Sequence, residues 1–453
     1  MRYKSRSSIE RTPNTLKNYS HIPFEPKRCS FFYGWVIAFV GALGVLMSLP
    51  GQTIGVSAFN EPLMEAVHLT RSQLALAYMI GTVTSAVFLT PAGKLYDKFG
   101  ARIMAIASSA VLGAVLIFLS YTGRITDHFH LNTLQTIAMT AFGFFVLRFS
   151  GQGVLTMTCR NMAMKWFDHF RGLVNGLQGP LVAMGFSMAP VWFGNMINRW
   201  GWDISWRSIG FFALFVFTIF AWIFYRDNPE ESGLIPDGKA AHSIKHKRDF
   251  TLFHEMTLKE TCSTISFWAI ALTLGYSGLF VTAFTYHHRA IFASAGLDVD
   301  TTIKFFFPVA AVISVILKIV GGILSDRITV RTLLFIFAAG HILSAIGFFL
   351  LETPAGIWII VMGYGIGGGF FSVLAGVCYP RLFGRKNLGA ISGLSMSIVV
   401  FSSALGPYLF STINDLRSSF TSAFYILILL IAILIVMAVK TTNPQTEKQL
   451  PVG

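Results

Sequence analysis

The sequence predicts an all-α membrane protein in which twelve transmembrane helices form two bundles of six. Of its 453 residues, 54% are hydrophobic and only 12% are charged, whereas an average soluble domain has about 25% charged residues. Apolar runs of about 20 residues, which is enough to cross a hydrocarbon core as a helix, recur along almost the whole chain. A short polar motif follows the second long run of each half, and this repetition predicts two similar bundles.

The apolar runs divide the chain into five parts. We expect a basic tail at residues 1–30, a first bundle at 31–225, a linker rich in Pro, Gly and basic residues at 226–262, a second bundle at 263–439 and a short tail at 440–453. The predicted spans are 31–59, 72–92, 103–121, 134–156, 172–197, 206–225, 265–286, 304–324, 333–351, 357–378, 389–410 and 420–439. Pro50 and Gln52 are expected to interrupt the first of them.

The net charge of +14 does not indicate a nucleic-acid partner, because the 35 Lys and Arg residues separate the spans instead of forming one patch. Most of them lie in alternate loops and in both tails. By the positive-inside rule, both termini are then cytosolic and the protein spans an inner or plasma membrane. The four cysteines show no paired spacing, so neither a disulfide framework nor a metal site is expected.

Two basic residues are predicted deep within spans, Arg148 in the fourth and Lys318 in the eighth, while no Asp or Glu is. Lys318 lies eight residues before Asp326, about 12 Å along a helix. Ionisable groups in hydrocarbon usually face a cavity. We therefore predict a central pocket for an anion, with one cation from each half. The alternative is that Arg148 hydrogen-bonds neighbouring helices and Lys318 snorkels to the interface.

The arrangement resembles the major facilitator superfamily, whose motif Gly-x-Leu-x-Asp-(Lys/Arg) matches both repeats, starting at Gly93 and at Gly322. Several stretches look like its oxalate-formate exchanger and monocarboxylate transporter branch: Phe32-Tyr33-Gly34-Trp35, Trp166-Phe167, Arg171-Gly172, residues 226–238, Phe267-Trp268 and Phe383-Gly384-Arg385. The resemblance covers residues 31–440.

The resemblance implies a substrate role for Lys318, which has the spacing of the family's substrate-binding Arg, four residues before the motif Gly. Lys keeps the charge but loses bidentate geometry. The oxalate exchanger's second cation, a Lys in span 11, has no counterpart here, which favours a monocarboxylate or larger organic anion over a small dicarboxylate. Arg148 resembles the family's span-4 Arg, which is often tied to proton coupling.

The resemblance also implies that Asp97 and Asp326 are latches, which pair with an Arg or cap a helix start and hold the halves together. The alternative is a turn-forming Asp. The remaining coupling and gating candidates share the two motif copies or lie at the outer end of span 7: Gly93, Arg102, Gly322, Arg327, Arg331 and His287. His287 could carry a proton, or be an ordinary interfacial His. Gln52 and Tyr364 are candidate neutral pocket donors or packing residues.

These observations predict a secondary active transporter of an organic anion, with a monocarboxylate favoured, that works by alternating access with proton symport or anion exchange. The partners would be the anion, the lipid bilayer and, for symport, protons. No enzyme motif, cofactor site or obligatory protein partner is evident. The alternatives are an exporter of a larger amphiphile, such as a siderophore or drug, and a non-transporting membrane sensor on the same fold.

Overall fold

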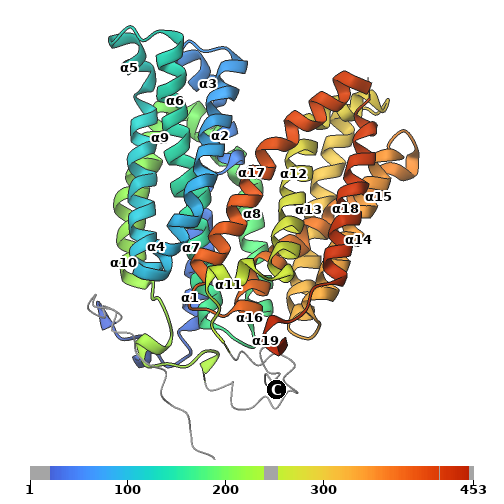
Figure 1. The fold of residues 1–453 in the computed structure, drawn as a ribbon. Coiled ribbons are helices and arrows are strands. Elements are labelled where there is room, and N and C mark those ends of the chain that lie inside the picture. The colour runs from blue at the N-terminus through green and yellow to red at the C-terminus, as the bar shows by residue number, and fades with distance from the viewer. Residues whose placement is uncertain (1–20, 239–253, 418, 448–453) are drawn as a thin grey trace, which may run out of the picture.

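The computed structural model describes residues 21–238, 254–417 and 419–447. Most of the basic N-terminal tail, the basic linker residues Lys245, Lys247 and Arg248, and the last six residues lie outside this part of the chain. The described residues fold into two groups of helices that meet near α16 and diverge toward α5 (Figure 1). We call these two ends of the molecule the α16 end and the α5 end.

The helices of the first group are α1 (Gly34–Met47), η3 (Leu49–Gly51), α2 (Thr53–Ser57), α3 (Asn60–Ala66), α4 (Arg71–Ser120), α5 (Thr122–His128), α6 (Thr133–Leu147), η4 (Arg148–Leu155), α7 (Thr156–Trp166), α8 (Arg171–Trp200), α9 (Trp202–Phe211), η5 (Phe212–Phe217) and α10 (Thr218–Phe224). Short helices η2 (Pro26–Arg28) and η6 (Glu230–Ser232) flank them.

The second group begins with α11 (Leu258–Cys262), α12 (Ile265–Ser294), α13 (Val299–Ser325), α14 (Val330–Phe349) and α15 (Pro354–Val373). It continues with η8 (Leu374–Cys378), α16 (Tyr379–Phe383), α17 (Leu388–Arg417), η9 (Phe420–Ser422), α18 (Ala423–Val439) and α19 (Pro444–Glu447). The segments η4, η5 and η8 are π-helical turns inside longer helices.

The predicted fold class is confirmed. Nine helices of the described chain are long and apolar enough to cross a membrane. Helix α4 supplies two spans, because Gly100 breaks it with a φ of 83°, a conformation that favours glycine. The shorter apolar helices α1 and α18 complete the predicted set.

Two expected boundaries were wrong, and one expected interruption was confirmed. The first motif copy is not an open loop, because the helix continues through Asp97 and turns only at Gly100. The first span is interrupted near Pro50 and Gln52, as expected: its regular helix ends at Met47, and Gln52 is extended. The fourth span runs on to Trp166 instead of ending at residue 156.

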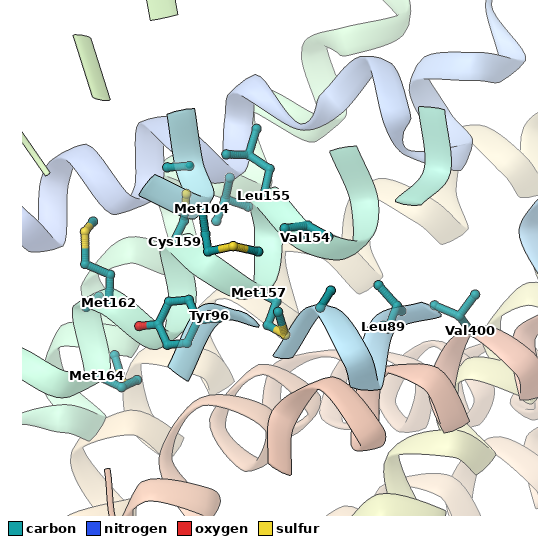
Figure 2. Packing of buried hydrophobic residues seen from close by; sticks show 14 of the residues in the cluster. Leu89, Tyr96, Met104, Val154, Leu155, Met157, Cys159, Met162, Met164 and Val400 are labelled. Atoms are coloured by element: carbon teal, nitrogen blue, oxygen red, sulfur yellow. The ribbon is translucent and has the colours of Figure 1, made fainter. Parts of the chain in front are cut away.

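The two groups of helices pack against each other through α4 with α17 and α8 with α13. One buried cluster crosses this junction and contains Leu89 of α4, Met157 of α7 and Val400 of α17 (Figure 2). These two helix pairs place polar residues of one bundle opposite those of the other.

Candidate functional site

Asp97, near the end of the first span of α4, caps a helix of the other bundle. Its two carboxylate oxygens accept hydrogen bonds from the backbone amides of Gly389 and Ala390, each at 2.7 Å. These amides belong to the first turn of α17, where free N–H groups and the helix dipole favour a negative charge. The motif carboxylate of the first bundle thus holds a helix start of the second.

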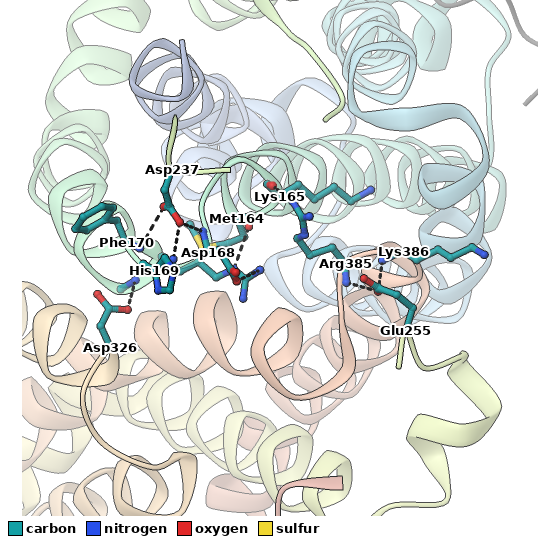
Figure 3. Close-up of polar contacts among 12 residues, drawn as sticks. Met164, Lys165, Asp168, His169, Phe170, Asp237, Glu255, Asp326, Arg385 and Lys386 are labelled. Atoms are coloured by element: carbon teal, nitrogen blue, oxygen red, sulfur yellow. Dashed lines mark hydrogen bonds and ion pairs between the residues drawn. The ribbon is translucent and has the colours of Figure 1, made fainter. Parts of the chain in front are cut away.

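Asp326 makes the same contact in the reverse direction. Directly after α13, it accepts hydrogen bonds from the amides of Gly172 at 3.0 Å and Leu173 at 3.2 Å, in the first turn of α8. Figure 3 shows Asp326 directed at this turn. Among the described residues neither motif Asp forms an ion pair, so of the two expected latch geometries the structure contains the helix cap.

The motif glycines allow this close approach. A Cβ atom added to Gly93 would lie 2.0 Å from the carbonyl oxygen of Gly389, and one added to Gly322 would lie 2.3 Å from that of Gly172. Real Cβ atoms essentially never approach another atom so closely. The helices can therefore cross in this arrangement only where both lack a side chain.

Residues of the linker also make contacts at the α16 end of the molecule. Asp237 accepts hydrogen bonds from the amides of Asp168 and His169, just before α8. Asp227 accepts one at 2.8 Å from the amide of Arg102, where the second span of α4 begins. Arg385 donates to Glu230 at 2.7 Å and to the carbonyl oxygen of Lys165, and so ties the second bundle to the linker and the first bundle (Figure 3).

The contacts described here for the other predicted gating residues lie within a single bundle. The side chain of Arg102 donates to the carbonyl oxygen of Trp222 at 2.8 Å, and that of Arg331 donates to the carbonyl oxygen of Thr441. Arg327 is exposed, with no side-chain partner in the described part of the chain. The ring of His287 packs against Phe420.

Arg148 is buried against its own bundle. Its guanidinium donates to the carbonyl oxygen of Gly51 and the hydroxyl of Thr53, both at 3.2 Å, and lies over the ring of Tyr78. Its buried Nε has no hydrogen-bond partner among the described atoms. The structure therefore does not bring Arg148 together with Lys318.

Lys318 instead crosses to the other bundle. Its aliphatic chain runs over Gly179 of α8, where an added Cβ atom would lie 2.4 Å from Cδ. The positive charge of Arg160 of α7 acts on it and repels it. Within the described residues, neither Lys318 nor Arg160 has a hydrogen-bond or ion-pair partner. One cation from each bundle thus lies unpaired at the junction.

A cavity of about 50 Å³ adjoins Arg160 between the bundles. Its polar lining includes Asn161, whose side-chain amide donates to Ser392 of α17 at 2.6 Å, and its apolar lining includes Phe371 and Met396. The full lining is Thr156, Met157, Arg160, Asn161, Leu274, Phe371, Ala375, Tyr379, Ser392, Ser395, Met396 and Val399.

The neutral donors predicted for the pocket lie outside this lining. Gln52 donates to Ser48 at 3.0 Å and to Thr156 at 3.1 Å, so it is one hydrogen bond away from the cavity. Tyr364 shares a hydrogen bond with Thr285 at 3.2 Å within the second bundle. Arg160 and Asn161 were not predicted as site residues, because hydropathy ended the fourth span too early.

The comparisons with known proteins agree with this architecture. The family model of the Major Facilitator Superfamily matches residues 36–407. The chain is 22% identical over 413 residues to the hexuronate transporter of Bacillus subtilis (strain 168), covering 86% of this chain and 90% of that protein. It is 24% identical over 406 residues to monocarboxylate transporter 13 of Bos taurus, covering 87% and 86%.

Among solved structures, the chain is similar to the proton:xylose symporter XylE bound to 6-bromo-6-deoxy-D-glucose. The TM-score is 0.60 at 15% identity, over 92% of this chain and 98% of that one, which shows a shared fold. The predicted family is thereby confirmed. The chain belongs to the Major Facilitator Superfamily and is a multi-pass membrane transporter, not an enzyme.

Proposed function

We propose that this transporter moves an organic anion, in the first instance a monocarboxylate, by alternating access. The observation that carries the proposal is the pair Arg160 and Lys318, one cation from each bundle and both unpaired among the described residues. Two desolvated cations without a carboxylate are costly unless an anion completes the site. Hexuronates and monocarboxylates, which name two of the relatives, are both carboxylates.

The same charges favour anion exchange over proton symport. Without its anion, the carrier would have to close around two cations that repel each other, so return of the empty carrier would be slow. A symporter also needs a group that carries the proton, and no Asp or Glu of the described spans lines the cavity. Exchange needs no such group, because one anion replaces another.

The α16 end is proposed to face the cytosol, which places both tails there as the distribution of basic residues predicts. The Asp97 and Asp326 caps then close the cytosolic side, and the structure corresponds to an outward-facing state. Opening to the cytosol would break both caps, together with the Asn161 to Ser392 hydrogen bond. The motif residues thereby act as the gate between the two bundles.

The experiment is uptake of radiolabelled monocarboxylates and dicarboxylates into proteoliposomes, with an inward proton gradient or with unlabelled anion inside. Uptake that requires internal anion supports exchange, whereas uptake driven by the proton gradient alone supports symport. If only larger amphiphiles move, the protein is an exporter of that class. If no solute moves under any condition, the sensor alternative is favoured and the transport proposal fails.

Replacing Gly179 with Ala is expected to raise the KM for the anion several-fold, because the new methyl group would displace the Lys318 side chain from its path across α8. Gly194→Ala on the same helix is the matched control, since a Cβ atom there meets nothing within 4 Å. Initial uptake rates over a range of anion concentrations measure the effect. An unchanged KM for Gly179→Ala would show that the position of Lys318 is unimportant.

A second prediction concerns pH at the latch. Burial raises the pKa of Asp326 to about 6, although the amides of Gly172 and Leu173, and then Arg381 and Arg171, oppose the rise. Acidification through pH 6 should protonate this carboxylate. Opening to the cytosol would expose Asp326 to water and return its pKa toward 3.8, so the closed α16 end binds this proton more tightly and acidification should disfavour the cytosol-open state. The folded protein likewise binds this proton more tightly than the unfolded chain, in which the pKa of Asp is about 3.8, so stability falls as Asp326 ionises between about pH 4 and 6.

The measurement is the distance between spin labels at His130 and Glu352, exposed residues of the two bundles at the α5 end, in a chain whose Cys29 and Cys262 are replaced by Ser. This distance should lengthen between pH 7 and pH 5, because protonation of Asp326 shifts the population toward the closed α16 end and the open α5 end. Asp326→Asn should remove the part of the change centred near pH 6. A full pH response in that variant would assign the transition to another group.

A further inference from the structure

A second polar cluster lies inside the second bundle, away from the junction. His341 of α14 is 1% exposed and Tyr276 of α12 is 6% exposed. Their ring centroids are 5.0 Å apart, and Phe337 covers His341 from another side at 4.4 Å. Neither ring nitrogen of His341 nor the hydroxyl of Tyr276 has a hydrogen-bond partner in the described part of the protein.

A small cavity of about 10 Å³ adjoins both side chains. Thr273 adds a third polar group to its wall, and the rest is apolar: Leu334, Phe337, Ala338, Ile431, Leu434 and Ala438. This volume is close to that of one water-sized probe. Tyr276 and His341 each lie eleven residues into their helices, about 16 Å along the axis, so the cavity is near the middle of a hydrocarbon core about 30 Å thick.

Buried polar atoms are nearly always hydrogen-bonded, to protein or to ordered water. At this depth the lipid supplies no partner, and α12, α14, α15 and α18 contain no Asp or Glu that could balance a protonated His341. A neutral histidine beside a hydroxyl is a good partner for a molecule that both donates and accepts. A cavity with two to four polar partners and room for one probe meets the requirements for an internal water.

We propose that this cavity binds one water molecule, shared by His341, Tyr276 and Thr273, which ties α12 to α14. The edge of the imidazole fits against α15 because position 367 is glycine, where an added Cβ atom would lie 2.9 Å from Cε1. The water would stiffen the second bundle at mid-depth, where it must move as a unit against the first during transport. This inference does not depend on the identity of the transported anion.

The test is hydroxyl-radical footprinting by a short X-ray pulse on the full chain in lipid nanodiscs, since radicals formed from a bound water modify side chains that bulk water does not reach. Corrected for intrinsic reactivity, Tyr276 should be modified at least tenfold faster than Phe348, which is fully buried in the same bundle. His341→Leu should reduce modification of Tyr276 to the level of Phe348. Equal protection of Tyr276 and Phe348 in the wild type would show a dry cavity and overturn the proposal.

A double-mutant cycle gives a second readout. If His341 and Tyr276 share one water, His341→Leu and Tyr276→Phe should each lower the Tm, and the double variant should lose no more than the worse single one. Additive losses would overturn the shared water. Should His341→Leu fail to fold, the footprinting comparison and Tyr276→Phe, which removes one oxygen atom, still decide the question. A Tm that changes between pH 5 and 8 in the wild type but not in His341→Leu would show that the site binds a proton, and would overturn the proposal of a water bound to a neutral histidine.

Discussion

Lys318→Ala is expected to abolish accumulation of the anion in proteoliposomes, and Arg160→Ala should have an effect of similar size. A hydrogen bond to a charged group contributes about 2 kcal/mol, so loss of either cation should weaken anion binding roughly 30-fold. Obligatory exchange should weaken further, because removing one cation removes the repulsion that slows return of the empty carrier. Anion exchange rates and affinities in the two variants measure both effects.

Lys318→Arg is the matched control, since it keeps the charge and restores a bidentate donor, and it should retain exchange. Arg148→Ala separates the structure-based site from the one predicted by sequence. Arg148 bonds the backbone of its own bundle, so its loss should lower thermal stability more than anion affinity. Normal exchange by Lys318→Ala would remove the carboxylate assignment while leaving the family and fold intact.

The fold was largely predictable because the bilayer imposes a length and an apolar composition on each span. The errors occurred where backbone geometry, not hydropathy, sets a boundary. Gly100 turns the chain within one residue, so no polar loop was needed between two spans. The interruption near Pro50 was predictable, because proline has no backbone N–H to continue a helix.

The candidate site was only half predictable. Lys318 stands alone in an apolar run, so its sequence context revealed it. Arg160 lies among polar neighbours, including Thr158 and Asn161, and so looked like part of a loop. Asn161 is polar because it faces the other bundle instead of lipid, and a single sequence does not show which face of a helix is lipid-exposed.

The repeated motif predicted that Asp97 and Asp326 are equivalent, yet not which residues they contact. Asp97 of the first bundle caps the start of α17 in the second bundle. Asp326 of the second bundle caps the start of α8 in the first. Such an exchange is a property of how two bundles are placed, which internal repetition alone does not determine. The structure shows which helices cross, and it identifies Gly93 and Gly322 as the positions where a substitution would test the crossings.

Gly93→Ala and Gly322→Ala are each expected to prevent closure at the α16 end and so to abolish exchange. The added methyl group would lie 2.0 Å from the carbonyl oxygen of Gly389 in the first variant and 2.3 Å from that of Gly172 in the second. Both obstacles are backbone atoms in helices, which cannot move aside as a flexible side chain would. The two bundles must then separate at that end, and the caps formed by the motif carboxylates are lost with them.

The effect should be conformational instead of destructive, because Ala is a better helix former than Gly by about 1 kcal/mol and each bundle keeps its own core. The spin-label distance between positions 130 and 352 should shorten in both variants, while Gly194→Ala, which meets no atom, leaves it unchanged. Anion binding should persist from the open side while exchange is lost. A variant that binds the anion, keeps the long distance and exchanges at the wild-type rate would show that the crossings are not the gate. The proposed anion site would be unaffected by that result, since it depends on Arg160 and Lys318 alone.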